Sequence, residues 1–249
     1  MKLTITLLLL LSFPFLRAHA AFIDIKPIQV CDDAGTTCAG MNFFENFTDK
    51  IWAQAGIDIN FLSSAQILET DWLDVDIDSN PANGELDNEA IAMIDYADAN
   101  INDSNATLAI NMFFVDLLDS SAGFFGLGCG APIYAAFCVN RTGIFISDNI
   151  FDINRYDTIA HEIGHVIGLT HGGFGAGGAE NLMTSGGSRS VPTSLNDISP
   201  DGLGLSNLTD AQIAEVYNSR FVQEMPEPAT WLLMMAMTAL FIPKRRTAC

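Results

Sequence analysis

Three histidines within one run of eleven residues constrain this chain more than any other feature. The run reads His161-Glu162-Ile163-Gly164-His165-Val166-Ile167-Gly168-Leu169-Thr170-His171. Residues four apart lie one above the other on a helix, so His161 and His165 can present their rings on one face. Glycine tolerates the backbone conformation that ends a helix, so Gly168 predicts a sharp turn that returns His171 to the same point. The fold must therefore supply a helix followed at once by a reversal.

The side chains of this run predict a metal site. Imidazole is the commonest zinc ligand, with bonds of about 2.0–2.1 Å, and three protein ligands leave a fourth position for water in catalytic sites. Glu162 is turned by about 100° around the helix from His161, so it can reach that water but not join the ligands. We predict that His161, His165 and His171 bind one Zn²⁺ and that Glu162 acts as the general base. The remaining histidine, His19, lies in a segment that we expect to be removed.

The pattern His-Glu-x-x-His-x-x-Gly-x-x-His resembles the signature of the metzincin clan of zinc endopeptidases. Asn181-Leu182-Met183-Thr184, about a dozen residues after His171, is similar to the methionine turn beneath the metal in that clan. The resemblance spans 43–221 and implies a two-lobed fold, with the active-site helix in the upper lobe and His171, the turn and a last helix in the lower. It also implies a zinc-dependent endopeptidase that acts on proteins or peptides.

Two positions depart from patterns that distinguish members of this clan. The residue after the third histidine is Gly172, which assigns no subfamily. Ser185 stands where some members carry a metal-binding tyrosine, so a fifth protein ligand is not expected.

The rest of the chain alternates between helical and strand-like patterns. We predict helices over 41–55, 89–99 and 208–221. Ile91, Ile94 and Tyr96 should face the core on the second of these, Asp157 should be the N-cap of the metal helix, and Thr209 should be the N-cap of the last helix. We predict strands over 57–62, 107–115, 131–139 and 143–147. This alternation indicates an α/β or α+β domain: a mixed twisted sheet with an active-site helix and a C-terminal helix.

The first twenty residues predict a secretory signal peptide. Lys2 precedes an apolar core, and Ala18-His19-Ala20 is a small-x-small cleavage site. A short membrane anchor is the alternative, but the apolar run is short for a span.

The C-terminus carries three elements in order: Pro226-Glu227-Pro228, an apolar segment over 229–242 and the basic tail Lys244-Arg245-Arg246. The order resembles the PEP-CTERM sorting signal of Gram-negative bacteria. That resemblance implies transient anchoring in the inner membrane, an exosortase partner, and delivery to the cell surface or extracellular matrix. An ordinary C-terminal anchor is the alternative. The apolar segment has 14 residues, whereas a spanning helix needs about 20.

We therefore expect a signal peptide over 1–20, one catalytic domain over 21–225 and a sorting signal over 226–249. The middle part holds six Lys and Arg against 29 Asp and Glu, a formal net charge of −23. Such a charge excludes nucleic acid as a partner and favours a solvated exported protein.

Four cysteines remain after processing, which predicts two disulfides in an exported chain. Three pairings can be drawn, and we expect the local pairs Cys31–Cys38 and Cys129–Cys138. A competing interpretation makes Cys129 a latch that silences the zinc.

Weaker patterns allow three additional interpretations. Asp74, Asp76, Asp78, Asn80, Asn83 and Asp87 form an acidic loop, and oxygen-rich loops can bind Ca²⁺, although Pro81 breaks the EF-hand pattern. A gluzincin would use a distant glutamate, for which Glu180 is the candidate, in place of His171. A surface or matrix binding protein on an inactive peptidase scaffold is the interpretation from another class, and the intact Glu162 argues against it.

Overall fold

The computed structural model describes residues 21–75, 88–102, 108–118, 124–130 and 141–225. The signal peptide, most of the acidic loop, the strand expected over 131–139 and the sorting signal lie outside these ranges. Those assignments, the domain boundaries that depend on them and the calcium site therefore stay predictions.

Seven strands of the described residues form one mixed sheet with the order β2-β1-β5-β8-β7, and β3 and β9 also pair with β1. Their bounds are β1 Ala21–Cys31, β2 Ile57–Phe61, β3 Ala65–Leu68, β5 Ile110–Val115, β7 Gly126–Cys129, β8 Gly143–Ser147 and β9 Gln223–Glu224. Pairing is parallel except for β7 with β8 and β9 with β1. Two further strands, β4 Asp74–Val75 and β6 Leu117–Leu118, pair separately. The expected α/β fold on a mixed sheet is confirmed.

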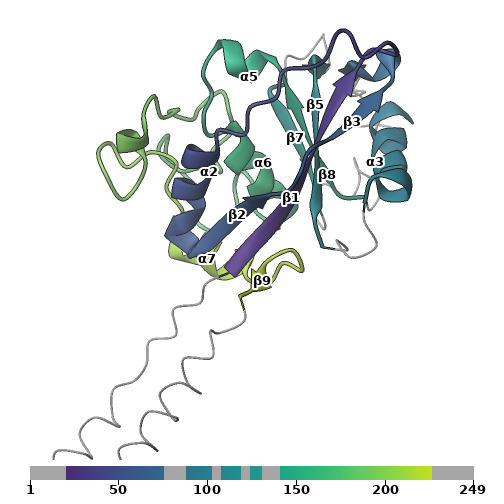
Figure 1. The fold of residues 1–249 in the computed structure, drawn as a ribbon. Coiled ribbons are helices and arrows are strands. Elements are labelled where there is room, and N and C mark those ends of the chain that lie inside the picture. The colour runs from purple at the N-terminus through teal and green to yellow at the C-terminus, as the bar shows by residue number, and fades with distance from the viewer. Residues whose placement is uncertain (1–20, 76–87, 103–107, 119–123, 131–140, 226–249) are drawn as a thin grey trace, which may run out of the picture.

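Helices cover both faces of the sheet (Figure 1). The helices α2 (Glu45–Trp52) and α6 (Thr158–Val166) pack on one face, and α3 (Asn88–Asn100) packs on the other. Successive strand residues point to opposite faces, so Phe114 joins the core under α2 and α6 while Phe113 joins the core under α3. Both faces are buried, which explains why β5 and β8 are largely apolar rather than alternating between apolar and polar residues.

The strand β1, which pairs with four other strands, has no counterpart among the predicted strands. Its first half pairs with β2 and its second half with β3, while β5 runs along its other side. Its first half buries odd-numbered side chains such as Ile23 beneath α2 and α6, and its second half buries Ile28 and Val30 against α3. The strand therefore organises both halves of the core.

Three predictions of local structure are corrected. The first helix begins at Glu45 rather than at residue 41, because Phe44 adopts a left-handed conformation with φ 45°. Tyr96 is exposed, and Met93 takes the inward position on α3. The last helix, α7, spans only Asp210–Val216, although Thr209 caps it as predicted by accepting a hydrogen bond from Gln212 N at 3.1 Å.

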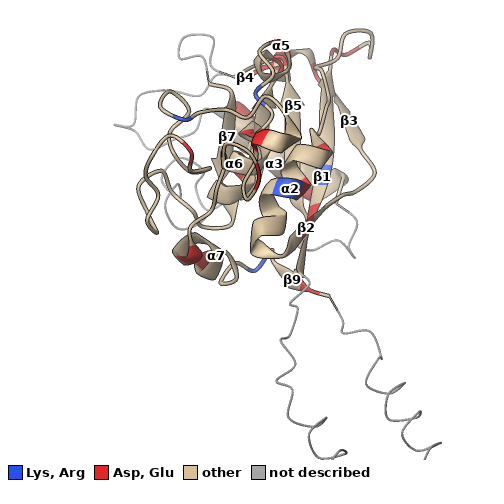
Figure 2. Cartoon of the chain, turned by 90° about the vertical axis from the view of Figure 1, so that its left-hand side faces the viewer, with Lys and Arg blue, Asp and Glu red and all other residues tan. Residues whose placement is uncertain are grey.

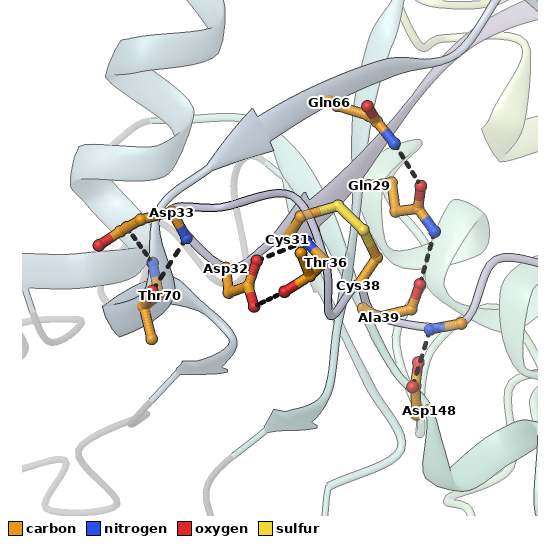
Figure 3. Close-up of a disulfide and its surroundings, with 11 residues drawn as sticks. Gln29, Cys31, Asp32, Asp33, Thr36, Cys38, Ala39, Gln66, Thr70 and Asp148 are labelled. Carbon is orange, nitrogen blue, oxygen red and sulfur yellow. Dashed lines mark hydrogen bonds between the residues drawn. A yellow bond between two sulfur atoms is a disulfide. The ribbon is translucent and has the colours of Figure 1, made fainter.

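The Cys31–Cys38 disulfide is present as expected and closes the turn that follows β1 (Figure 3). Inside this turn the Asp32 carboxylate accepts hydrogen bonds from the backbone and hydroxyl of Thr36, each at 2.7 Å. Asp33 and Thr70 exchange two hydrogen bonds of 3.0 Å, which tie the turn to the segment after β3.

Cys129 is also disulfide-bonded, and its partner lies outside the described residues. The Cys129–Cys138 pair therefore stays a prediction. A bonded Cys129 has no free thiol, so the latch interpretation is wrong for this form of the chain.

Carboxylates occur on several elements of the surface, among them α7 and the end of β9, whereas Lys and Arg are few (Figure 2). Among the described residues, no helix combines the length and the apolar character needed to cross a bilayer.

Candidate metal centre

The helix α6 carries His161, Glu162 and His165, and all its residues from Thr158 to Val166 are buried. It lies between the sheet and the loops that lead to α7. The helix ends at Val166, and Gly168 follows with φ 108°, so the predicted reversal at this glycine is confirmed. Because the chain turns here, His171 comes back toward the face of α6 that carries His161 and His165.

The three imidazoles converge on one point. The Nε2 atoms lie 3.1 Å apart for His161 and His165, 3.1 Å for His161 and His171, and 3.2 Å for His165 and His171. Nitrogens bound to one tetrahedral zinc ion by bonds of about 2.0–2.1 Å lie about 3.3–3.4 Å apart. The spacing of the three rings therefore fits a single zinc ion.

Hydrogen bonds on the far side of two rings orient them for binding. Nδ1 of His161 donates to Leu182 O at 2.6 Å and also lies 2.7 Å from Arg189 Nη1, whereas Nδ1 of His165 donates to Leu169 O at 2.9 Å. A ring that carries its proton on Nδ1 leaves the Nε2 lone pair free for a metal. The Leu169 carbonyl thus selects the ligating tautomer of His165, and the Leu182 carbonyl favours the same tautomer of His161.

The environment keeps these rings neutral. Burial is the largest cause that holds the pKa of His161 well below its usual range, and the positive charge of the neighbouring Arg189 is the second. Burial likewise lowers the pKa of His165 to about 4 and, to a smaller extent, lowers the pKa of His171. Neutral imidazole is the form that binds metal, so the site favours the competent state at neutral pH.

Glu162 is buried between α6 and the edge strand β7. Burial raises the pKa of its carboxyl to about 8, while Arg189 and the Gly128 amide oppose that rise. A Cβ on Gly126 would lie 2.7 Å from Glu162 Cγ, and a Cβ on Gly128 would lie 2.5 Å from Glu162 O. A side chain at position 128 would meet the backbone of α6, and one at position 126 would displace the Glu162 carboxyl. The sequence interpretation had not singled out either glycine.

Met183 lies beneath α6, as the predicted methionine turn requires. The turn is held by Asn181, whose Oδ1 accepts from Met183 N at 3.0 Å and from Gln212 Nε2 at 3.1 Å. A Cβ on Gly164 would lie 2.6 Å from Met183 Sδ, so the close packing of the sulfur against the helix depends on this glycine.

Asp157 precedes α6, but its carboxylate does not cap the helix, which corrects the prediction. The carboxylate instead accepts from Arg189 Nε at 2.8 Å and from Ser206 Oγ at 3.1 Å. Arg189 was missed by the sequence interpretation, because a lone arginine in a glycine- and serine-rich loop gives no local signal. Its Nη1 also donates to Thr184 O at 2.9 Å, so it fixes the turn that carries Met183.

The three histidines and Glu162 line one cavity of about 350 Å³. The other walls come from residues 124–128 around β7, from 185–187 after the methionine turn, and from Arg155, Thr158 and Arg189. Among the described residues, the cluster able to hold a metal consists of His161, His165 and His171. Glu180 is not part of that cluster, so the structure does not support the gluzincin alternative.

A cavity in which three neutral imidazoles converge beside a buried carboxylate defines a candidate metallohydrolase site. Residues 39–172 match the family model for metallopeptidase family M12B, reprolysin-like, and the chain belongs to this family. The expected metallopeptidase identity is therefore confirmed. Among solved structures, the zinc-dependent peptidase from Methanocorpusculum labreanum is similar at 12% sequence identity, with a TM-score of 0.37. That match covers 76% of this chain and 99% of the other. No curated protein matches the chain.

Proposed function

We propose that this protein is an exported zinc endopeptidase in which His161, His165 and His171 hold the metal and Glu162 is the general base. The observation that carries this proposal is the convergence of three Nε2 atoms within 3.2 Å of one another, in the cavity that Glu162 also lines. A zinc ion bound there supplies a Lewis acid that polarises the scissile carbonyl and lowers the pKa of water.

Glu162 performs the proton transfers in this proposal. Its carboxylate accepts the proton of the attacking water at Oε1 or Oε2 and later gives it to the leaving amine. Gly126 packs closely against the side chain of Glu162 and Gly128 packs against its backbone, so the residue is held in place and little reorganisation is needed during the transfer.

A peptide substrate is supported by the position of β7. Among the described strands, β7 stands at the end of the sheet and pairs with β8, and residues 126–128 line the cavity. The open side of an edge strand offers backbone donors and acceptors to an extended chain. A peptide that pairs with β7 would pass directly beside Glu162.

The catalytic proposal is tested with the zinc-loaded protein and a quenched peptide or casein. We expect cleavage that a chelator abolishes and zinc restores. Glu162→Gln should keep the zinc and lose nearly all turnover, whereas His171→Ala should loosen the zinc. Full turnover in Glu162→Gln would remove this residue from the base role, and unchanged zinc content in His171→Ala would place the third ligand elsewhere.

The export part of the proposal depends on the sequence of the two ends. Removal of 1–20 by signal peptidase and removal of the tail after Pro226-Glu227-Pro228 by an exosortase would release the catalytic part to the cell surface or matrix. Mass spectrometry of the protein from a Gram-negative host with and without an exosortase measures both ends. A mature protein that retains Lys244-Arg245-Arg246 in the presence of the exosortase would contradict the sorting step.

A further inference from the structure

Arg155 places a second guanidinium in the wall of the active-site cavity, beside Arg189. It lies in the turn between α5 (Asn149–Asp152) and α6, where its backbone N donates to Ile150 O at 3.0 Å. Its Cζ lies 4.7 Å from the centroid of the Phe125 ring, and its Nη2 donates to Gly186 O at 3.2 Å. The side chain therefore spans the wall between the segment before β7 and the segment after the methionine turn.

The charge of Arg155 has no carboxylate partner within the described residues, because none of the ion pairs found there involves it. A guanidinium has five N–H donors, and in the described part of the chain this one makes a single side-chain hydrogen bond, to Gly186 O. Its Nε is buried and has no hydrogen-bond partner among the described residues, and burial, together with the charge of Arg189, lowers the pKa of Arg155. A partly buried charge without a partner is unfavourable, so the site is suited to an incoming anion.

Three of the other five described cations have a carboxylate partner, whereas Lys26 and Arg220 have none among the described residues but do not line this cavity. Arg189 pairs with Asp157, Arg141 pairs with Asp95, and Lys50 pairs with Asp201. Arg155 and Arg189 are two of only six Lys and Arg in residues 21–225, and of the described residues that line the cavity, Glu162 is the only carboxylate. An acidic ligand is therefore repelled by most of the surface and attracted to this cavity.

The same wall of the cavity also contains a neutral polar residue, Thr158. Thr158 lines the cavity at the start of α6, and its Oγ1 is buried without a hydrogen-bond partner among the described residues. A carboxylate that pairs with Arg155 can also accept from this hydroxyl. Two unsatisfied donor groups on one wall indicate a specific subsite rather than a general electrostatic effect.

We propose that Arg155 is a specificity-determining residue that selects peptides with an Asp or Glu side chain next to the scissile bond. This inference rests on the proposed endopeptidase function and narrows its substrate class. The substrate carboxylate pairs with the free N–H groups of Arg155 in charge-assisted hydrogen bonds, which are about twice as strong as neutral ones. A Gln or Asn side chain has the same shape but leaves the charge of Arg155 unpaired, so it is bound less well.

The test uses the zinc-loaded protein and quenched peptides in matched pairs, Glu against Gln and Asp against Asn, on either side of the cleaved bond. We expect a kcat/KM ratio of at least about tenfold in favour of the acidic peptide for the wild type. Arg155→Met should bring this ratio close to one while the neutral peptide is still cleaved. Arg220→Met is the matched control, because Arg220 is exposed, lies against Phe221 and does not line this cavity, and it should keep the wild-type ratio.

Arg155→Lys separates a folding defect from a change in selectivity. It keeps the charge but loses the planar fork, so the acidic peptide should remain preferred by a smaller factor, with a thermal unfolding midpoint near that of the wild type. A wild type that cleaves acidic and neutral peptides equally would overturn the inference and leave the peptidase intact. If kcat/KM falls by the same factor for the acidic and the neutral peptide in both Arg155→Met and Arg155→Lys, Arg155 has only a structural role. Failure of the zinc-loaded wild type to cleave any peptide would instead overturn the proposed function itself.

Discussion

Arg189 Nε lies 2.8 Å from Asp157 Oδ2, and both side chains are buried beside the candidate metal centre. Asp157 stands at the start of α6, whereas Arg189 follows the turn that carries Met183. Ser206 connects the loop before α7 to this pair, because its hydroxyl donates to the same carboxylate oxygen of Asp157 at 3.1 Å. One ion pair therefore joins the three segments that surround the histidines.

We predict that Asp157→Asn lowers the free energy of unfolding by about 3–5 kcal/mol, because removing one partner leaves the guanidinium of Arg189 buried and uncompensated. The Asp157→Asn/Arg189→Met double variant should lose less than the two single losses combined. Urea denaturation with the disulfides intact measures the free energy of unfolding of Asp157→Asn, Arg189→Met and the double variant. Lys50→Met is the control, since the Lys50–Asp201 pair is more exposed and its loss should cost about 0–1 kcal/mol. Equal losses in Asp157→Asn and Lys50→Met would contradict the role given to the buried pair.

The metal helix could be predicted from sequence because its chemistry is local. The ligand spacing, the glycine that ends the helix and the carboxylate beside the first ligand all fall between His161 and His171. The strand over 57–62 and the cap at Thr209 were also recognised from short patterns, and the structure has both.

The missed elements depend on pairing between distant segments. The strand β1 begins where the signal peptide was expected to end, and its buried residues change from odd to even positions near Pro27, which obscures the alternation. The strand β7 is Gly126-Leu127-Gly128-Cys129, a sequence with little β-propensity that is placed by its pairing with β8 and by contact with α6. Arg155 and Arg189 lie far apart in sequence and meet only when the cavity forms.

The glycine at 126 gives a test of how closely β7 approaches Glu162. A Cβ at this position would lie 2.8 Å from Glu162 Oε1, so Gly126→Ala should displace the carboxylate without touching the histidines. We expect kcat to fall by about tenfold or more while the zinc content stays at one ion per chain, an effect of about 1.4 kcal/mol or more on the barrier. Steady-state kinetics and metal analysis measure the two quantities.

Gly177→Ala is the matched control for this prediction, because nothing lies within 4 Å of a Cβ at that position. Its kinetics should equal those of the wild type. Gly126→Ala with unchanged kcat would mean that Glu162 can move aside without loss, which would weaken its role as a fixed base.

The Cys31–Cys38 disulfide closes a short loop at the end of β1. Chain-entropy arguments assign a loop of this size about 2–3 kcal/mol. We therefore expect the Cys31→Ala/Cys38→Ala double variant to lose about that much free energy of unfolding, with the zinc content unchanged. Because Cys31 is fully buried in β1, Ala rather than Ser is the appropriate replacement. Loss of zinc in this variant would show that the turn supports the distant metal centre.

Asp49 on α2 gives the chain a stability that depends on pH. Its Oδ1 is buried and has no hydrogen-bond partner in the part of the chain that the structure describes. Burial, with the nearby charges of Asp58 and Glu45, raises the pKa of Asp49 from 3.8 to about 6. The folded state therefore holds this proton more tightly than the unfolded state does, and the folded protein loses stability as the pH rises from about 4 to about 6.

Asp49→Asn removes this charge and should stabilise the protein above that range but not below it. The full shift corresponds to about 3 kcal/mol, and because Asp49 is only partly buried, screening by solvent reduces the expected gain to about 1 kcal/mol at pH 8. At pH 4 the folded protein already carries the neutral carboxyl, so the gain should vanish. Urea denaturation at the two pH values measures the difference, with Asp71→Asn, an exposed position on the 3₁₀ turn Thr70–Trp72, as the control. A gain of equal size at pH 4 and pH 8 would mean that the amide improves packing rather than relieving a buried charge.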